Sequence, residues 1–176
     1  MERLKVLVVE DDRITQRLYG QFLPEDIFEL HLAKTGGEAL EIYHTWQPEV
    51  IILDLMLPEI TGYSVLKEIR ENLEDKTIPI IISSILSNRD DVLACAKFGI
   101  QGYFFKPTIW KEIGLRVLEC ARRTYPQMAA RFAELKKELE AKREFKERSK
   151  IKGEPPEQVE AKVEPKEQPK AKAEPE

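Results

Sequence analysis

Residues 4–12 read LKVLVVEDD, an apolar, valine-rich run that ends in three acids. A short run of this kind predicts a buried β-strand over residues 4–9. Four similar runs follow along the chain, at residues 27–33, 50–53, 78–83 and 102–105. Between them lie segments with helical spacing of apolar residues, at residues 13–23, 36–46, 63–72, 88–98 and 109–123. Five strand–helix repeats with short loops predict an α/β fold built on a doubly wound parallel sheet.

The five predicted strands differ in how we expect them to be buried. Four of them are almost wholly apolar, which is typical of strands covered on both faces of a sheet. The second strand instead alternates, with Phe28 and Leu30 next to Glu29 and His31. This alternation predicts that residues 27–33 form an edge of the sheet.

Charged side chains stand where three of the predicted strands end: Glu10 and Asp11, Asp54, and Lys106. Because the carboxyl ends of parallel strands meet at one edge of a sheet, we expect these four groups to lie together. Three carboxylates in one crevice repel one another unless a cation sits among them. The residues therefore predict a divalent-metal site with a lysine across from it.

Composition is consistent with one globular domain that carries an appendage. The chain has 176 residues, of which 42% are hydrophobic, and this is enough for a core of its own. A net charge of −4 and a pI near 5.5 give no overall attraction to nucleic acid or to anionic membranes. No signal peptide and no apolar run long enough to cross a bilayer is present in the sequence. We therefore expect a cytoplasmic protein that does not associate with a membrane.

The two cysteines and the charge pattern bear on how the chain is divided. Cys95 and Cys120 lie in apolar helical segments without CxxC spacing, which favours buried free thiols. By segment, residues 1–120 carry a charge of −7, residues 121–152 carry +6 and residues 153–176 carry −3. An acidic body, a basic stem and a mixed tail indicate three parts with different roles.

Four stretches resemble the signatures of the response-regulator receiver domain: VLVVEDD (6–12), DLMLPEITG (54–62), PIIISS (79–84) and GIQGYFFKP (99–107). They occur in the order and at the separations that are usual in that family, and together they cover residues 3–123. The resemblance implies a flavodoxin-like fold with strand order 2-1-3-4-5. That order agrees with an edge position for the second strand.

The resemblance also implies a role for each charged group. Asp54 would be the phosphoacceptor, taking a phosphoryl group from a histidine kinase or a histidine phosphotransfer protein. Asp11, Asp54 and the backbone carbonyl of Met56 would bind Mg²⁺, and Glu10 would act through a bound water. Lys106 would neutralise a phosphoryl oxygen on the side away from the metal. The adjacent Asp12 either touches the metal or begins the following helix.

Switching in this family couples a hydroxyl at the end of the fourth strand to an aromatic residue on the fifth. We expect Ser83 to donate to a phosphoryl oxygen and Tyr103, three residues before Lys106, to rotate into the vacated space. Ser84 stands where the family usually has alanine, and it is small enough to admit the phosphoryl group. The bond between Lys106 and Pro107 is usually cis in the family.

Two positions flank the path of the hydrolytic water in this family, and the resemblance implies that the apolar residues Met56 and Ile85 occupy them here. Neither side chain can orient a water by a hydrogen bond, so we expect slow autodephosphorylation and a long-lived signal. On this interpretation the chain catalyses its own phosphorylation and is not an enzyme in the usual sense.

Beyond residue 123 the resemblance stops, and we predict a receiver domain over 1–123, a basic helical extension over 124–152 and a disordered tail over 153–176. In the extension, Met128, Phe132, Leu135 and Leu139 have 4-3-4 spacing for only about one and a half heptads. Folding back on the domain, continuing the fifth helix and self-association all stay open. The tail is rich in Pro, Glu, Lys and Ala, with no aromatic residue to support a core.

The predicted function is that of a stand-alone response regulator or phosphorelay shuttle that acts on a downstream protein target, with a phosphorylation-dependent homodimer left open. The alternative is a DNA-binding transcriptional regulator that uses the basic C-terminal helix. A phosphatase of the haloacid-dehalogenase type also uses an aspartyl nucleophile and magnesium. That family needs a second aspartate two residues after the nucleophile, where this chain has Met56.

Overall fold

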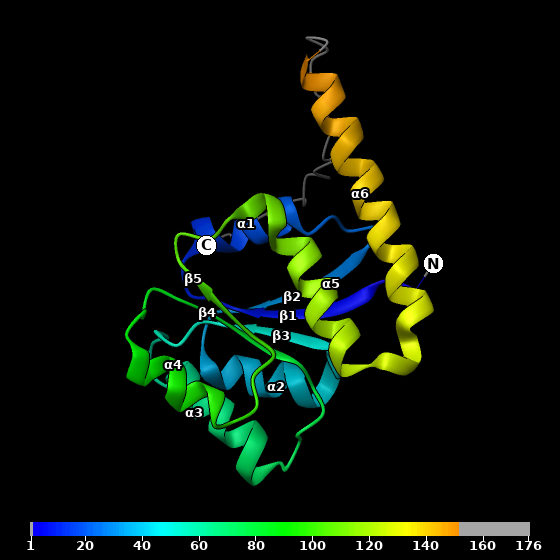
Figure 1. Cartoon of the computed structure of the whole chain (residues 1–176). Helices are drawn as coiled ribbons and strands as arrows, with labels where there is room; N and C mark the ends of the chain where they lie inside the picture. The colour runs from blue at the N-terminus through cyan, green and yellow to red at the C-terminus, as the bar shows by residue number, and fades with distance from the viewer. Residues whose placement is uncertain (1, 152–176) are drawn as a thin grey trace, which may run out of the picture.

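The computed structural model describes residues 2–151 and has a five-stranded parallel sheet at its centre (Figure 1). The strands are β1 (Leu4–Val9), β2 (Phe28–Ala33), β3 (Val50–Leu53), β4 (Ile80–Ser84) and β5 (Gly102–Phe105). Their order across the sheet is β2-β1-β3-β4-β5, and every neighbouring pair is parallel. The predicted strand order and the edge position of the second strand are therefore confirmed.

Helices cover both faces of the sheet (Figure 1). On one face lie α1 (Arg13–Phe22) and α5 (Ile113–Thr124), and on the other lie α2 (Gly36–Trp46), α3 (Gly62–Lys67) and α4 (Arg89–Ala96). Side chains of a strand alternate between the two faces. In β1, Val6 and Val8 therefore join one core cluster, while Leu7 and Val9 join the other. This is why the central strands are almost wholly apolar until they end, with Lys5 of β1 as the exception.

Side-chain caps set where several helices begin. Asp12 accepts from the backbone N–H of Thr15 at the start of α1, with an N–O distance of 2.7 Å. Thr35 and Asn88 cap α2 and α4 in the same way. Each cap satisfies a backbone donor that has no partner within its helix. Asp12 thus takes the helix-starting role of its two predicted roles.

The predicted third helix changes its winding partway along. After α3 the chain continues as a π-helix over Glu68–Asn72, which contains the buried Arg70. The guanidinium of Arg70 donates to the carbonyl oxygens of Phe98, Asp75 and Ile78 at 3.0, 2.7 and 2.7 Å. The wider turn accompanies a charged side chain that ties three loop carbonyls together.

The C-terminal segment folds back on the domain. A 3₁₀ turn, Pro126–Met128, leads into α6 (Ala129–Ile151), which returns alongside α5 and extends past the rest of the fold (Figure 1). Phe132, Leu135 and Leu139 are buried in the same core cluster as the α5 residues. A Cβ on Gly114 of α5 would lie 2.9 Å from the Cδ2 of Leu139, so the two helices approach closely at this glycine. Of the three arrangements left open, the helix adopts the folded-back one.

Polar contacts also hold α6 in place. Arg131 forms a half-buried ion pair with Glu49 before β3 and donates to the carbonyl oxygen of Arg3 at 2.7 Å. Lys142 forms an ion pair with Asp26, at the amino end of β2. The core thus continues beyond the predicted domain boundary at residue 123. The predicted tail, 153–176, lies outside the described residues.

Two expectations from composition can be compared with the fold. Cys95 and Cys120 are both free and buried, as predicted. Among residues 2–151, no helix is both long and apolar enough to cross a bilayer.

Candidate functional site

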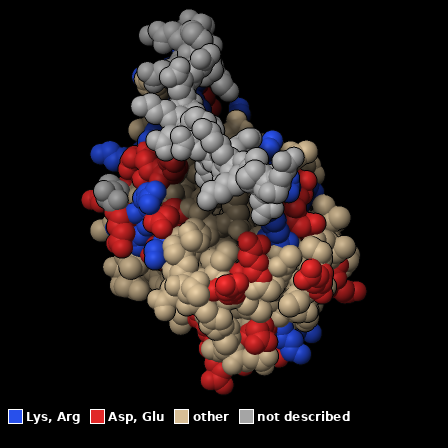
Figure 2. Space-filling model, turned by 180° about the vertical axis from the view of Figure 1, so that it is seen from behind, with Lys and Arg blue, Asp and Glu red and all other residues tan. Residues whose placement is uncertain are grey.

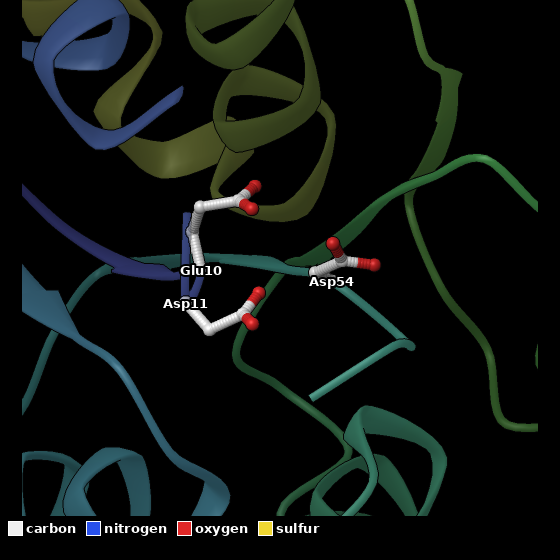
Figure 3. A group of neighbouring side chains, drawn as sticks. All are labelled: Glu10, Asp11 and Asp54. Atoms are coloured by element: carbon white, nitrogen blue, oxygen red, sulfur yellow. The ribbon is translucent and has the colours of Figure 1, made fainter. Parts of the chain in front are cut away.

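The four charged groups predicted to meet do lie together, at the carboxyl edge of the sheet. Glu10 and Asp11 occupy the turn after β1, Asp54 follows β3, and Lys106 follows β5. One carboxylate oxygen from each of the three acids lies within 4.8 Å of the others. Figure 3 shows Glu10 and Asp11 projecting from the end of β1 toward the side on which Asp54 lies.

Lys106 holds two of the acids directly. Its Nζ donates to Oδ2 of Asp54 at 2.5 Å and to Oε2 of Glu10 at 2.6 Å. The side chains of Glu10 and Asp54 are only 3% and 7% exposed, so the ammonium neutralises carboxylates that are almost out of water. Burial raises the pKa of Glu10 even though the hydrogen bond from Lys106 opposes that shift. For Lys106, burial works against the charged form, but its bonds to Asp54 and Glu10 prevail and raise the pKa of the ammonium.

Backbone and amide contacts fix the loops that carry these acids. The side-chain amide of Gln16 on α1 donates to the carbonyl oxygen of Glu10 at 2.5 Å. The N–H of Asp54 donates to Val9 O at 3.0 Å, and the N–H of Met56 donates to Oδ1 of Asp54, also at 3.0 Å. Both oxygens of the Asp54 carboxylate are thus engaged, one by its own loop and one by Lys106.

Gly62 explains how the loop after β3 closes so tightly. A Cβ at this position would lie 1.8 Å from the carbonyl oxygen of Asp54, closer than any side chain allows. The N–H of Gly62 in turn donates to Leu55 O at 3.1 Å. Only glycine can occupy this position while the loop holds Asp54 at the sheet edge.

The donor set fits a small, hard cation such as Mg²⁺. Three carboxylates supply oxygen ligands, and Asp11 is exposed where Glu10 and Asp54 are buried. Lys106 holds Oδ2 of Asp54 and Oε2 of Glu10, and Asp11 adds a third carboxylate beside them. The predicted roles of the Met56 carbonyl and of a water on Glu10 stay predictions.

The two serines at the end of β4 have different neighbours. Ser83 is buried, and its Oγ accepts from the hydroxyl of Tyr19 at 2.8 Å. Ser84 is also buried, and it lies on the same face of the sheet as Tyr103, because Ile82 is paired with Tyr103 and side chains two residues apart on a strand share a face. The prediction that Ser83 moves to make room for Tyr103 disagrees with these contacts, because Ser84 is the serine beside Tyr103.

Tyr103 is half-buried and connects β5 to the loop after β4. Its hydroxyl donates to the carbonyl oxygen of Leu86 at 2.7 Å, and its ring packs against the core cluster that contains β4. Burial raises the pKa of Tyr103 to about 12, so the phenol stays a neutral donor. The bond between Lys106 and Pro107, three residues further on, is cis as expected.

Met56 and Ile85 are two exposed apolar residues on the loops that surround the site. Their side chains are 54% and 64% exposed, and each follows closely on a residue of the site. Leu86, the next residue, is also apolar. None of the three offers a polar side-chain atom at the edge of the site.

Sequence reasoning missed Gln16 and Tyr19, which support the site from α1. Both are buried polar side chains, three residues apart on the inner face of that helix. A polar residue at the buried positions of an amphipathic helix needs a partner in the interior. That requirement was the available signal, although it does not say which partner is chosen.

Comparison with known proteins agrees with this geometry. A family model described as "Response regulator receiver domain" matches residues 6–117. The sequence is 34% identical over 120 residues to "Probable transcriptional regulator ycf27" of Guillardia theta, covering 68% of this chain and 46% of that protein. It is 29% identical over 137 residues to "Response regulator MprA" of Mycobacterium bovis, covering 75% of this chain and 59% of the other.

A similar solved structure is the receiver domain of the Francisella response regulator 1452. It has a TM-score of 0.62 and 33% sequence identity to this chain, and the match covers 69% of this chain and 99% of that one. The curated relatives are longer, and this chain spans about half of their length.

Proposed function

Because the chain belongs to the response regulator receiver domain family, we propose that it accepts a phosphoryl group on Asp54 from a phosphohistidine. Receiver domains are phosphoacceptors of two-component signalling that interact with histidine kinases and downstream effectors. The donor here is a histidine kinase or a histidine phosphotransfer protein. The observation that carries the proposal is a buried Asp54 carboxylate held between Lys106 and two further acids.

The chemistry is a displacement at phosphorus. An oxygen of Asp54 forms a new bond to the phosphorus atom, and the bond from phosphorus to the donor's histidine nitrogen breaks with its electron pair leaving on nitrogen. Lys106, already bonded to Asp54, is placed to follow the charge onto a phosphoryl oxygen. Mg²⁺, held by Asp11 and Asp54 with Glu10 nearby, would neutralise the negative charge that gathers on the phosphoryl oxygens.

Within this mechanism we assign the phosphoryl-binding hydroxyl to Ser84 in place of Ser83. Ser83 Oγ accepts a buried 2.8 Å hydrogen bond from Tyr19, which holds the side chain in place and opposes its movement toward a phosphoryl oxygen. Ser84 has only a long contact, 3.4 Å from the N–H of Leu86, to give up. Ser84 lies on the same face of the sheet as Tyr103, so a shift of Ser84 would free space near that ring, which supports the same assignment. The resulting change at β5 and α4 would alter which protein binds there.

Beryllofluoride and acetyl phosphate with Mg²⁺ test the central claim. Acetyl phosphate should add one phosphoryl group to the wild type, read by intact mass, and none to Asp54→Ala. Ser84→Ala should weaken beryllofluoride binding more than Ser83→Ala does. Equal labelling of Asp54→Ala and wild type would exclude Asp54 as the acceptor. Sedimentation of the beryllofluoride form distinguishes a phosphorylation-dependent dimer from a monomer.

The lifetime of the phosphoryl group is a second property that the site predicts. With Met56 and Ile85 exposed and apolar, no side chain there orients an attacking water, so loss of phosphate should be slow. Met56→Asn with Ile85→Glu should shorten the half-life of the phosphorylated form. Ile85 lies two residues after Ser83, and Leu86 lies two residues after Ser84. If Ser84 is the phosphoryl-binding hydroxyl, Met56→Asn with Leu86→Glu should therefore shorten the half-life more than Met56→Asn with Ile85→Glu. Equal half-lives in all three proteins would contradict this proposal.

DNA binding through α6 is the second candidate, because two of the relatives described above are a response regulator and a named transcriptional regulator. In this chain the apolar side of α6 packs on α5, and Lys142 is paired with Asp26. Acidic side chains also gather near the centre of the face shown in Figure 2. Duplex affinity that falls steeply with salt would support this candidate, and affinity that stays weak at low salt would exclude it.

A further inference from the structure

Tyr19 makes two contacts that join separate parts of the site. Its hydroxyl donates to Ser83 Oγ at the end of β4, at 2.8 Å. Its ring meets Trp110 edge-on, with centroids 5.1 Å apart and planes at 81°. Trp110 begins the 3₁₀ turn Trp110–Glu112, four residues after Lys106. One buried side chain of α1 therefore touches both the end of β4 and the segment that follows β5.

The hydrogen bond between Tyr19 and Ser83 is shielded from solvent. Both residues are buried, at 0% and 1% exposure, so neither hydroxyl can exchange this partner for solvent. Burial, together with the nearby charges of Glu10 and Asp54, raises the pKa of Tyr19, while the Ser83 bond opposes that shift. The phenol is therefore a neutral donor, and it lies within electrostatic reach of the two acids that Lys106 holds.

The segment from Lys106 to Trp110 is held at its two ends, and a buried hydroxyl in its middle has no hydrogen-bond partner among the described residues. At one end Lys106 is bonded to Asp54 and Glu10, and at the other Trp110 packs on Tyr19 and stacks on Phe22, with centroids 6.1 Å apart. Between them the Oγ1 of Thr108 is buried and has no hydrogen-bond partner among the residues the structure describes. A buried hydroxyl without a partner makes this arrangement less favourable than one that satisfies it.

We propose that Tyr19 is a positioning residue that couples phosphorylation of Asp54 to the segment of residues 106–110. The inference rests on the proposed function, because it takes Asp54 as the acceptor. When Lys106 follows the new charge on Asp54, the segment behind it shifts and Trp110 moves against the Tyr19 ring. Tyr19 in turn holds Ser83, so the end of β4 that presents Ser84 responds to the same movement. Phosphorylation would thus change the conformation at α1 and at the start of α5, in addition to the surface around Tyr103.

Trp110 supplies a direct readout. The chain has two tryptophans, so Trp46→Phe leaves Trp110 as the only one. In this background, titration with beryllofluoride in the presence of Mg²⁺ should change the fluorescence emission of Trp110 in a single transition. Its midpoint is the beryllofluoride concentration at half of the change. Tyr19→Phe keeps the ring and removes the bond to Ser83. It should raise the midpoint roughly two- to tenfold, which corresponds to the loss of one hydrogen bond.

A matched control is available at the opposite edge of the sheet. Tyr43 also donates from its phenol to a partner far along the chain, Oδ2 of Asp75 at 2.7 Å. Tyr43→Phe should lower stability without moving the beryllofluoride midpoint. Ser83→Ala should move the midpoint as far as Tyr19→Phe does, and the double variant should move it no further, because all three remove the same bond.

The outcomes separate this inference from the function on which it rests. No acetyl phosphate adduct on wild-type Asp54 would overturn the proposed function. An adduct without a change in Trp110 emission, or a Tyr19→Phe midpoint equal to that of the wild type, would overturn the coupling alone. If Tyr19→Phe fails to fold by circular dichroism, Ser83→Ala decides the question by the same midpoint.

Discussion

At the scale of single residues, the site is a set of buried polar groups that are satisfied in pairs. Lys106 satisfies Asp54 and Glu10, Gln16 satisfies the carbonyl of Glu10, and Tyr19 satisfies Ser83. Each pairing removes the cost of burying a group that would otherwise be hydrated. The pairs also define what phosphorylation must rearrange, since a new phosphoryl group competes for the same donors.

Thr108 is the exception, and replacing its hydroxyl should stabilise the fold. Thr108→Val replaces a buried hydroxyl that has no partner among the described residues with a methyl group of similar size. We expect the free energy of unfolding to rise by about 1 kcal/mol, because the desolvation cost of the hydroxyl is removed. The midpoint of urea denaturation measures this change.

Thr35→Val is the matched control for Thr108→Val. Thr35 caps α2 by accepting from the N–H of Glu38 at 3.2 Å, so the same substitution there should cost about 1 kcal/mol. A loss of stability in Thr108→Val comparable to that in Thr35→Val would mean that the Thr108 hydroxyl has a partner after all.

The residues that the sequence identifies well are those whose position follows from a strand end. Asp54, Glu10 and Lys106 each stand directly after a strand, and the sheet then brings them together. The division of roles between Ser83 and Ser84 is not available in this way. Both are small hydroxyl residues at the end of one strand, and the choice between them depends on Tyr19 and Tyr103, which come from other elements.

At the scale of elements, the periodic pattern predicts the helices and strands but not their winding or their last turns. The third helix was expected as one continuous segment over 63–72, yet its second half is a π-helix. The π-helix contains Arg70, whose buried guanidinium donates to the carbonyl oxygens of Asp75 and Ile78 in the loop that follows and of Phe98 after α4. The helix propensities of these residues do not predict a change from α-helical to π-helical winding.

Asp75, in the loop after the π-helix, gives a pH-dependent prediction. Partial burial acts to raise the pKa of Asp75, but hydrogen bonds from Thr77, Tyr43 and Ile78 prevail and lower it below 3.8. A carboxylate with a lowered pKa in the folded state stabilises the fold above its unfolded pKa, and this contribution is lost as the pH falls through the folded pKa. The wild type should therefore lose stability in acid partly through Asp75.

Asp75→Asn tests this contribution. The variant should be less stable than the wild type at pH 7, by about 1–2 kcal/mol, and the difference should shrink as the pH falls below 3.8. Urea denaturation of both proteins at pH 7 and at pH 3 makes the comparison. A difference that is the same at the two pH values would show that the charge of Asp75 is not what stabilises the loop.

At the scale of the whole molecule, α6 is part of the folded domain. The predicted boundary at residue 123 follows the end of the family resemblance, whereas the core cluster continues to Leu139. The 4-3-4 spacing of apolar residues was visible in the sequence. Its partner was not, because a short apolar stripe fits a second copy as well as it fits the flank of α5.

Two phenylalanines of α6 measure how much this helix contributes. Phe132 is 1% exposed and Phe145 is 74% exposed, so the same substitution samples the packed and the projecting part of one helix. Phe132→Ala should lower the free energy of unfolding by about 3–5 kcal/mol, while Phe145→Ala should change it by less than about 0.5 kcal/mol. Chemical denaturation followed by circular dichroism gives both values.

Equal and small effects of the two substitutions would mean that α6 detaches readily from α5. In that case the alternative left open by the sequence, self-association through the same stripe, would regain support. Sedimentation of the wild type over a range of concentrations would then decide between the two.

The anchoring of α6 has a mechanical consequence. Arg131 ties the base of this helix to Glu49 and to the start of β1, and Lys142 ties it to Asp26. A helix held at two points keeps a fixed orientation on the domain. Along an α-helix, each residue adds 1.5 Å of length and turns the chain by about 100°. A fluorophore attached at Phe145 would thus have a fixed bearing relative to Asp54. Inserting a single residue between Lys142 and Phe145 would rotate the direction of the fluorophore about the helix axis by more than a quarter of a turn.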